Sequence, residues 1–482
     1  QLEQHIPGDI LRYIAENDIH FYIIDANKES QALGLGNRSN MVLQAAFFKL
    51  ANVIPVEDAV EHMKAAVKKT YGLKGEKVVN MNIAAVDAGI NALVQVQVKP
   101  EWKNLSGAAI QPPRADVPDV IKNILVPINA QKGDDLPVSA FRGMEDGTMP
   151  LGTSQYEKRG IATHLPVWDK DECIQCNRCS MCCPHAAIRP VLLTDEEKAG
   201  VPDSFVTAPA KGLGKDAPKY NFRMQLSPYD CLGCGVCLTA CPAKDALTWA
   251  PFEEMKSEQP LFDDVAMNES YLKKDVISDK SVKNVQFAKP YFQFSAACAG
   301  CAETTYIKLL SQLFGDRMYV GNAAGCSSAI SGGAPILPYC RDCKGHGPAW
   351  EHSLFEDNAE FAFGFYHAQD AIRKELLIRI EALKNAGVAA EEAAAYLADW
   401  NDREKSREVS DKLIAALEAA EQTDEVKYIL DNREFLAKKS VWAVGGDGWA
   451  YDIGFGGIDH VMAQNQDVNL LVLDTEVYSN TG

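Results

Sequence analysis

Two apolar runs close to the end of the chain, with a glycine-rich segment between them, predict a strand–helix–strand unit. The strands are expected at 441–446 and 469–474, and the helix at 451–464. A strand, a helix and a strand in succession place the two strands parallel and adjacent or nearly so. The residues that follow each strand should therefore lie at one edge of a sheet.

The first 112 residues show the alternating pattern of α/β structure. A short buried strand is expected at 20–25 and helices at 41–50 and 56–70, with Ser39 or Asn40 capping the first of them. The stretch 83–98 has helical spacing first and strand character at its end. Gly34 and Gly36 complete no phosphate-binding motif, so a turn is the simpler interpretation.

The middle of the chain is less regular. Proline and glycine are frequent over 113–163, which predicts a linker or wrapping segment. The stretch 189–227 has too little periodicity to predict a core of its own. The stretch 368–439 is rich in Ala, Glu, Lys and Leu at helical intervals, which predicts an inserted helical hairpin with a solvated charged face.

The composition and charge of the chain exclude some classes of function. The 482 residues suit about three or four domains. A net charge of −18 argues against nucleic-acid binding, and no apolar run approaches the roughly 20 residues of a membrane span. Fourteen cysteines indicate a reducing, cytoplasmic environment. Because the chain opens at Gln1 without Met and stops soon after an apolar strand, we expect a part of a longer protein.

Two cysteine runs carry the strongest chemical signal. In each run two residues separate the first three cysteines, three more follow before the fourth, and the fourth precedes proline. This is the spacing of a two-cluster bacterial ferredoxin, in which the fourth cysteine of each run binds the other cluster. The predicted ligands are Cys173, Cys176, Cys179 and Cys241 for one cluster, and Cys231, Cys234, Cys237 and Cys183 for the other.

Zinc sites and disulfides are the alternatives to this interpretation. Zinc sites show pairs of Cys, or Cys with His, rather than fours that end in Cys-Pro, and disulfides need an oxidising compartment. Cys182 is an extra thiol, for which a small buried side chain is the simpler interpretation. A third group comprises Cys298, Cys301 and Cys326, and its spacing alone leaves a zinc site, a redox pair and a third cluster open, with Cys340 and Cys343 as possible further ligands.

Oxygen-bearing residues follow both strands of the predicted unit. Asp447, between Gly446 and Gly448, comes after the first strand, and Thr475 comes after the second. Open α/β sheets bind ligands at the carboxyl ends of their strands. Oxygen ligands suit Mg²⁺, which usually shares its coordination with phosphate. The spacing thus predicts a magnesium–phosphate site.

These motifs together resemble the pyruvate:ferredoxin (flavodoxin) oxidoreductase family, which the chain would match over essentially all of its length as the carboxy-terminal portion. The resemblance rests on Gly446-Asp447-Gly448 with the partner turn 474–482, on the Cys298, Cys301 and Glu303 segment, on Gly325-Cys326 and on 345–350. The family pattern for the magnesium–thiamine diphosphate motif commonly has Asn where this chain has Thr475.

The resemblance implies an α/β multidomain fold. It consists of a Rossmann-like α/β domain that contacts coenzyme A (1–112), the linker (113–163), a ferredoxin-like domain with two 4Fe–4S clusters (164–270), and a thiamine diphosphate-binding α/β domain with a proximal cluster (271–482). The helical insertion at 368–439 belongs to the last domain. The thiamine-pyrimidine domain of the family lies before Gln1, so this stretch alone is expected to be inactive.

The resemblance also implies residue roles. Asp447 and Thr475 would bind Mg²⁺ by their side chains, and Val477 by its carbonyl. Glu303 and the Cys326 backbone would contact thiamine diphosphate, with Asn480 beside the reacting centre. Cys298, Cys301 and Cys326 would hold the proximal cluster, whose fourth ligand lies beyond Gly482, leaving Cys340 and Cys343 as structural thiols. Asn40 and Asn82 match coenzyme A contacts, and Asp467 and Asn469 match a calcium site or a simple polar turn.

The implied reaction is the oxidative decarboxylation of pyruvate with coenzyme A. Electrons would pass singly from thiamine diphosphate through three 4Fe–4S clusters to ferredoxin or flavodoxin, in an enzyme expected to be a homodimer. Two alternatives remain open: a related enzyme for 2-oxoglutarate, oxalate or another 2-oxoacid, and a polyferredoxin subunit without catalysis.

Overall fold

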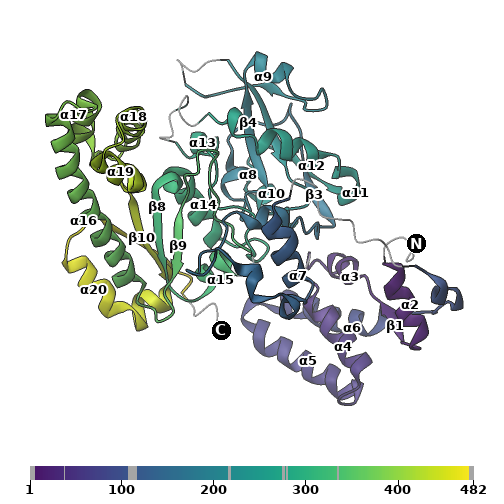
Figure 1. The fold of residues 1–482 in the computed structure, drawn as a ribbon. Helices are drawn as coiled ribbons and strands as arrows, with labels where there is room; N and C mark the ends of the chain where they lie inside the picture. The colour runs from purple at the N-terminus through teal and green to yellow at the C-terminus, as the bar shows by residue number, and fades with distance from the viewer. Residues whose placement is uncertain are drawn as a thin grey trace. The chain divides into compact units, whose positions relative to one another are not determined.

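The computed structural model describes residues 6–36, 38–106, 117–214, 219–273, 277, 281–333 and 336–476. The chain divides into two compact units, Gln1–Arg114 and Ala115–Gly482 (Figure 1). In these described ranges, no helix is both long and apolar enough to cross a membrane.

The first unit is built mainly from helices that pack on one another. Ala45, Met63 and Val86 join three of these helices in one buried cluster. The two strands pair antiparallel, with Phe21 opposite Val96. In chain order the elements are α2 (Gly8–Glu16), β1 (Phe21–Ile23), α3 (Ala26–Ala32), α4 (Asn40–Ala51), α5 (Val56–Tyr71), η1 (Gly72–Lys74), α6 (Glu76–Asn91), β2 (Val94–Val96) and η2 (Pro100–Asn104).

The helices of this unit confirm the pattern, whereas its first strand is shorter and more exposed than predicted. α4 and α5 lie where helices were predicted, and α6 followed by β2 confirms the change from helix to strand. Ser39 stands at the start of α4, but its side chain makes no capping hydrogen bond. A strand is present within 20–25, as predicted, but β1 has only three residues and none of them is buried, so the prediction of a buried strand was wrong in that respect.

The Rossmann-like expectation for this unit was also wrong. Its described residues contain one antiparallel pair of strands in place of a parallel sheet. The reason lies in the packing. Only one side of the pair is covered, by Leu11 and Trp102, so these short strands cannot form the two-sided core that a parallel sheet requires.

The second unit begins with short helical turns that run over later parts of the chain. The Gly152 amide donates to the Tyr339 carbonyl at 2.6 Å, and the Ser154 hydroxyl donates to the Gln293 carbonyl at 2.8 Å. The C-terminal part of this segment therefore packs against later parts of the same unit. Its elements are η3 (Ile121–Leu125), α7 (Val126–Asn129), η4 (Gly133–Asp135), η5 (Val138–Phe141) and η6 (Thr153–Tyr156).

Next come two small antiparallel sheets and the short helices that carry cysteines. One sheet pairs β3 (His164–Trp168) with β7 (Leu247–Pro251), and the other has the order β4-β6-β5. The remaining elements are α8 (Arg178–Met181), β4 (Ile188–Leu193), α9 (Asp195–Ala199), β5 (Ala208–Pro209), β6 (Asn221–Leu226), α10 (Val236–Ala240), α11 (Phe252–Met255), α12 (Glu258–Leu261), η7 (Phe262–Ala266), η8 (Glu269–Tyr271) and α13 (Val282–Val285).

The β4-β6-β5 sheet corrects the expectation that 189–227 lacks a core. Every residue of β4 is buried, and Val191, Leu193 and Phe205 form a cluster with residues of α12 and η7. A strand that is buried on both faces shows no alternation of polar and apolar residues, so periodicity missed it. Buried Arg189 and Arg223 interrupted the apolar run further.

The last part of the unit contains a parallel sheet of order β11-β10-β8-β9. β10 and β11 pair directly, with Val441 opposite Val468 and Gly446 opposite Leu473, which confirms the predicted strand–helix–strand unit. The elements are α14 (Glu303–Phe314), η9 (Gly315–Arg317), β8 (Met318–Asn322), α15 (Cys326–Gly332), β9 (Ala349–His352), β10 (Ser440–Gly446), η11 (Trp449–Ile453), α20 (Phe455–Ala463) and β11 (Val468–Leu473).

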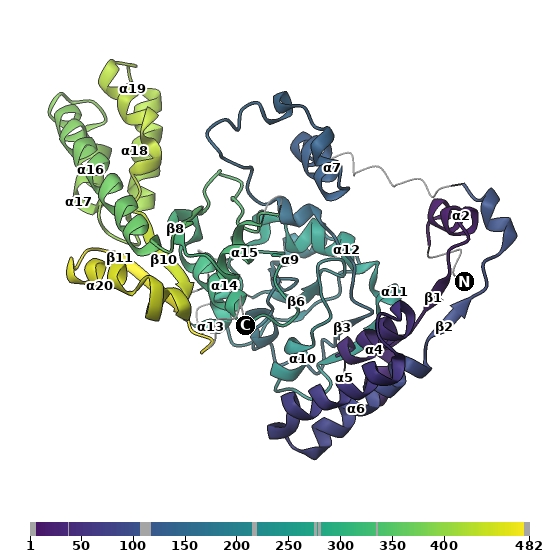
Figure 2. The same cartoon turned by 90° about the horizontal axis from the view of Figure 1, so that it is seen from below.

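Helices cover both faces of this sheet. α16 and α20 lie on one face, and α14 and α15 lie on the other, as Figures 1 and 2 show. Ala359, Ala362, Ala443 and Ile458 form the core on the first face. Ile307, Val320, Ile330 and Val444 belong to the core on the second face.

The helical insertion has more helices than the predicted hairpin. It consists of α16 (Asn358–Asn385), α17 (Ala390–Asp399), α18 (Ser406–Ala419), α19 (Asp424–Asp431) and η10 (Arg433–Phe435), so it begins before 368. Buried Leu376, Tyr396 and Leu413 hold these helices together. A helix break follows α16 at Gly387, which has a φ of +80°. Helical spacing does not show where one helix ends, and this explains the discrepancy.

Candidate functional site

Four cysteines from two distant runs line one cavity of the second unit. They are the predicted set of Cys183 from the first run with Cys231, Cys234 and Cys237 from the second. Gly233 and Gly235 have positive φ angles of 65° and 77°, which let the chain turn tightly between these cysteines. The side chains brought together match those that the crossed spacing assigned to one cluster.

A second cavity is lined by the other predicted set, Cys173, Cys176, Cys179 and Cys241. The structure thus groups eight cysteines into two fours, and each four takes its odd member from the other run. Across the described residues, no three His, Cys, Asp or Glu side chains lie close enough to bind a single metal ion. Four thiols around an apolar cavity fit the ligand set of a 4Fe–4S cluster.

The surroundings of these thiols make the free thiolates unfavourable. Burial raises the pKa of Cys231 to about 12, and the charges of Cys183 and Cys234 act in the same direction. Burial raises the pKa of Cys179 and of Cys237, again with help from neighbouring cysteines. Iron must therefore displace protons when it binds, which couples cluster assembly to pH.

The third cysteine group lies next to the cavity lined by Cys183, Cys231, Cys234 and Cys237. Gly300, between Cys298 and Cys301, packs against Cys234 and Val236, since a β-carbon at Gly300 would lie 3.8 Å from the Cys234 β-carbon. Cys326 begins α15, after a short turn that follows β8. Cys340 is buried and its thiol donates to the Pro290 carbonyl, and Cys343 is exposed.

The carboxyl edge of the parallel sheet brings together residues that are far apart in the sequence. Asp447 follows β10 and Thr475 follows β11, and the Thr475 hydroxyl donates to Asp447 Oδ1 at 3.4 Å. Glu303 begins α14, and its pKa is raised by burial and then by the charge of Asp447. A carboxylate and a hydroxyl in contact, with a second carboxylate nearby, are oxygen donors that suit Mg²⁺.

A tryptophan supports this edge from below. A β-carbon at Gly445 would lie 2.6 Å from the Trp449 ring, and one at Gly454 would lie 2.2 Å from it. Both glycines therefore allow the indole to pack under the turn that carries Asp447. The Tyr451 hydroxyl donates to Asp474 Oδ2 at 2.9 Å, which ties η11 to the end of β11. The structural roles of Trp449 and Tyr451 were not predicted from the sequence. The glycines at 445 and 454, which make room for the indole ring, were the signal that could have indicated the role of Trp449.

Several predicted site residues gain no direct support. Val477 and Asn480 lie outside the described residues. Asn40 begins α4, and Asn82 in α6 donates to the Val78 carbonyl of its own helix at 2.9 Å. Their contact with coenzyme A stays a prediction.

The predicted calcium residues make other contacts. Asp467 pairs with Lys438 at 2.8 Å and with Arg403 at 3.3 Å. Asn469 donates its side-chain amide to the Val441 carbonyl at 2.9 Å. These contacts favour the polar turn over a cation site, because two basic side chains already compensate the Asp467 carboxylate.

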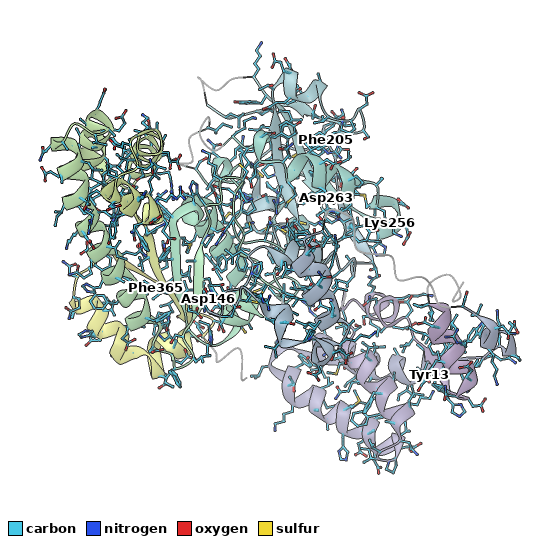
Figure 3. All side chains as sticks on the ribbon, in the orientation of Figure 1. Tyr13, Asp146, Phe205, Lys256, Asp263 and Phe365 are labelled. Atoms are coloured by element: carbon cyan, nitrogen blue, oxygen red, sulfur yellow. The ribbon has the colours of Figure 1, made fainter. Side chains whose placement is uncertain are left out.

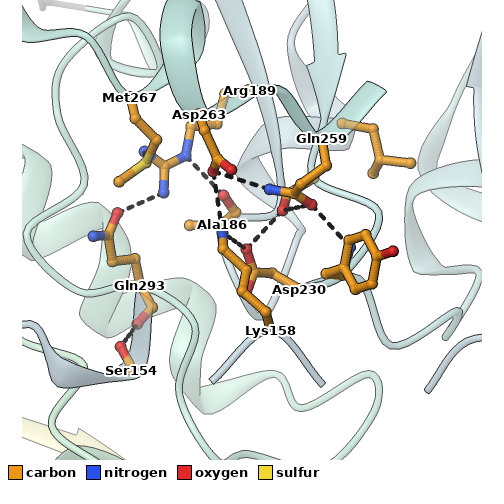
Figure 4. Close-up of polar contacts among 12 residues, drawn as sticks. Ser154, Lys158, Ala186, Arg189, Asp230, Gln259, Asp263, Met267 and Gln293 are labelled. Carbon is orange, nitrogen blue, oxygen red and sulfur yellow. Dashed lines mark hydrogen bonds and ion pairs between the residues drawn. The ribbon is translucent and has the colours of Figure 1, made fainter. Parts of the chain in front are cut away.

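A buried polar network supports the cysteine cavities, and sequence reasoning missed it as well (Figure 4). Lys158 Nζ lies 2.7 Å from Asp230 and 3.2 Å from Asp263, the latter labelled in Figure 3. Asp230 precedes Cys231. Burial raises its pKa, and Lys158 opposes that shift. Arg189 donates to the Ala186 carbonyl at 2.8 Å and to Gln293 at 2.6 Å. The network thus fixes both loops that carry cavity cysteines.

The fold and the two cysteine-lined cavities define an iron–sulfur protein with an α/β multidomain fold and a ferredoxin-like domain. Comparison with known families agrees. A family model described as a 4Fe-4S dicluster domain matches residues 172–245, one described as pyruvate ferredoxin/flavodoxin oxidoreductase matches residues 2–92, and a domain of unknown function matches residues 108–162.

The chain is a homologue of the pyruvate:ferredoxin and pyruvate-flavodoxin oxidoreductases. It is 48% identical over its full length to the pyruvate:ferredoxin oxidoreductase of Moorella thermoacetica, of which it covers 42%. It is 48% identical to the pyruvate-flavodoxin oxidoreductase of Enterobacter agglomerans, of which it covers 41%. A pyruvate dehydrogenase [NADP(+)] of Cryptosporidium parvum is 40% identical, with 28% of that protein covered. The chain thus spans about two-fifths or less of these curated relatives.

Proposed function

We propose that this chain is the cluster-bearing and thiamine diphosphate-binding part of a pyruvate:ferredoxin or pyruvate:flavodoxin oxidoreductase. Pyruvate and coenzyme A would give acetyl-CoA, CO₂ and a proton, and two electrons would leave through 4Fe–4S clusters to two one-electron acceptors. The observation that carries this proposal is the contact between Thr475 and Asp447 at the sheet edge, in the same unit as the two cysteine cavities.

The sheet edge would hold the organic cofactor. Asp447 and Thr475, with the Val477 carbonyl, would bind Mg²⁺, and the flanking Gly446 and Gly448 leave room for the diphosphate. Glu303, the Cys326 backbone and Asn480 would contact the rest of the cofactor. Bound thiamine diphosphate supplies an electron sink for the decarboxylation of a 2-oxoacid.

The protein's own residues would orient the cofactor and carry its charge. Asp447 is partly buried and Thr475 is exposed, so a ligand can reach both from the open side of the edge. Burial, and then the charge of Asp447, raise the pKa of Glu303, so this carboxyl group lies within electrostatic reach of the proposed magnesium site. Trp449 holds the Asp447 turn in place from the buried side.

Three clusters would form the electron path. Cys298, Cys301 and Cys326 would hold the cluster nearest the sheet edge, with a fourth ligand from beyond Gly482. The cluster of Cys183, Cys231, Cys234 and Cys237 would come next, and that of Cys173, Cys176, Cys179 and Cys241 last. Packing of Gly300 against Cys234 supports this order, because it brings the group of Cys298 and Cys301 beside the cavity that contains Cys234.

The other family assignments belong to the same proposal. The first 112 residues would contact coenzyme A through Asn40 and Asn82, and a linker would follow at 113–163. The ferredoxin-like domain at 164–270 would hold two clusters, and the domain at 271–482 would bind thiamine diphosphate. We propose a homodimer in the cytoplasm, where fourteen free thiols suit the reducing environment.

A substrate screen on the complete protein tests the proposal. Reduction of methyl viologen would be followed with coenzyme A and either pyruvate, 2-oxoglutarate or oxalate, together with analysis of bound thiamine diphosphate. We expect bound cofactor and fastest reduction with pyruvate. Faster reduction with another 2-oxoacid would show that this other compound is the preferred substrate. Clusters without bound thiamine diphosphate and without turnover would make the protein a polyferredoxin subunit.

A further inference from the structure

The buried face of α14 is unusually polar. Thr304, Lys308, Ser311 and Gln312 recur at helical spacing, and each is at most 3% exposed. Ser311 accepts from the Phe292 amide at 3.1 Å, and Gln312 donates to the Val285 and Ala288 carbonyls. Lysine is almost never fully buried unless its charge is compensated, so Lys308 calls for an explanation.

Lys308 ends in a cluster of backbone carbonyls. Its ammonium group donates to the carbonyls of Ser180, Met181 (2.9 Å) and Cys183 (3.2 Å). An ammonium group has three N–H donors, and these three acceptors use all of them. Its hydrogen-bond partners here are neutral carbonyls rather than a carboxylate, so they orient the cation without cancelling its charge.

The turn that Lys308 contacts joins the two cysteine cavities. It starts directly after Cys179, which lines one cavity, and ends at Cys183, which lines the other. Lys308 is therefore placed to act on both cluster sites through a single short stretch of backbone. Glu303, at the sheet edge, begins the same helix.

We propose that Lys308 is a positioning residue that fixes the crossover turn and raises the reduction potentials of both clusters, most strongly that of the cluster held by Cys183. A reduced cluster carries one more negative charge than an oxidised one, so a buried cation stabilises the reduced state. The inference depends on the cluster assignment and not on the identity of the substrate.

The test is a redox titration of the complete protein followed by electron paramagnetic resonance. Lys308→Met keeps the side-chain length and removes the charge. We expect both cluster midpoints to become more negative, with the Cys183 cluster shifted by at least tenfold in its reduced-to-oxidised ratio at a fixed potential. Tenfold corresponds to about 59 mV for one electron. In the unaltered protein the two clusters of the ferredoxin-like domain should give signals separate from that of the proposed third cluster, and the signal lost in Cys183→Ala identifies the cluster held by Cys183.

Gln312→Met is the matched control. Gln312 lies on the same buried face, is 3% exposed and donates to two carbonyls, but carries no charge. It should leave both midpoints unchanged. An equal shift in Gln312→Met, or unchanged midpoints in Lys308→Met with full iron content, would overturn the proposal.

A charge-conserving variant covers the case in which Lys308→Met loses iron. Lys308→Arg should then retain both clusters with midpoints close to those of the unaltered protein, which would still support the proposal. Loss of iron from both variants would contradict it, because the position would then require the shape of lysine rather than its charge.

Discussion

The cysteine cavities and the carboxyl edge of the parallel sheet are both predicted cofactor sites, but they differ in how far the chain encloses them. The cavities are closed by β4, β6 and the network of Lys158 and Arg189. The sheet edge is open: Thr475 is exposed, and Tyr451, which contacts Asp474, is more than half exposed. Ile453 and Phe455, on the segment that follows Asp447, are also more than half exposed.

The difference shows what each site needs. A closed site can be organised by the chain itself before its cofactor arrives, since its loops are already hydrogen-bonded. An open site with an apolar rim is typical of a surface that binds a ligand or another protein. Variants in the two regions should therefore fail in different ways, and the effects should separate cluster content from thiamine diphosphate content.

The largest effect is expected in the closed region. Cys183→Ala should remove one of the two clusters of the ferredoxin-like domain and abolish electron delivery to an external acceptor, because that cluster loses a thiolate ligand. Iron analysis and electron paramagnetic resonance measure the loss. Cys182→Ala is the matched control and should keep both clusters. Equal iron loss in the two variants would contradict the assignment of Cys183 as the crossing ligand.

The next effect belongs to the open edge. Asp447→Ala should lose bound thiamine diphosphate and reduce pyruvate-dependent viologen reduction by more than the roughly 10- to 100-fold that the loss of a supporting residue costs at a metal site. Cofactor analysis and steady-state assays check this. Iron content should not change. If iron fell together with thiamine diphosphate, the two regions would not be separate sites.

A smaller effect concerns the stability of the closed region. Lys158→Met leaves Asp230 and Asp263 without their cation and should lower the free energy of unfolding by about 3 kcal/mol, the lower end for a broken buried pair because Lys158 keeps some exposure. Chemical denaturation measures this change. Lys412→Ala breaks an exposed pair with Glu408 and should leave the denaturation midpoint unchanged. A similar loss of unfolding free energy in both variants would show that the buried network contributes no more to stability than an exposed ion pair.

The smallest effect distinguishes the hydroxyl of Thr475 from its methyl group. Thr475→Ser keeps the oxygen and should lower the turnover rate by less than about 10-fold, whereas Thr475→Val should lower it by more than that. Magnesium dependence of the turnover rate provides the measurement. Equal rates in Ser and Val variants would remove Thr475 from the proposed magnesium site.

The sequence predicted what local spacing encodes. The two cysteine runs pointed to the groups that line each cavity, and the apolar runs at 441–446 and 469–474 predicted the parallel pair. The helices α4, α5 and α6 followed from periodicity. In each case the signal lies within a few residues or in one repeated pattern, so no knowledge of distant contacts was needed.

What escaped prediction depends on contacts between distant segments. β4 is buried on both faces and shows no alternation. Arg189 and Lys308 are buried because groups from distant segments accept their hydrogen bonds, the Gln293 side chain for Arg189 and the Met181 carbonyl for Lys308. The packing of Trp449 under Gly445 needs the sheet to exist first. Spacing alone cannot show that Lys308 reaches the turn after Cys179, because Lys308 and this turn are 125 to 128 residues apart along the chain and meet only in the fold.

The most direct test mixes the complete protein with pyruvate in the absence of coenzyme A and of any acceptor, and follows the absorbance of the clusters in a stopped-flow instrument. The account predicts bleaching of the clusters in the unaltered protein and none in Asp447→Ala, whose clusters should still be bleached by dithionite. Bleaching by pyruvate at the same rate and extent in both proteins would contradict it.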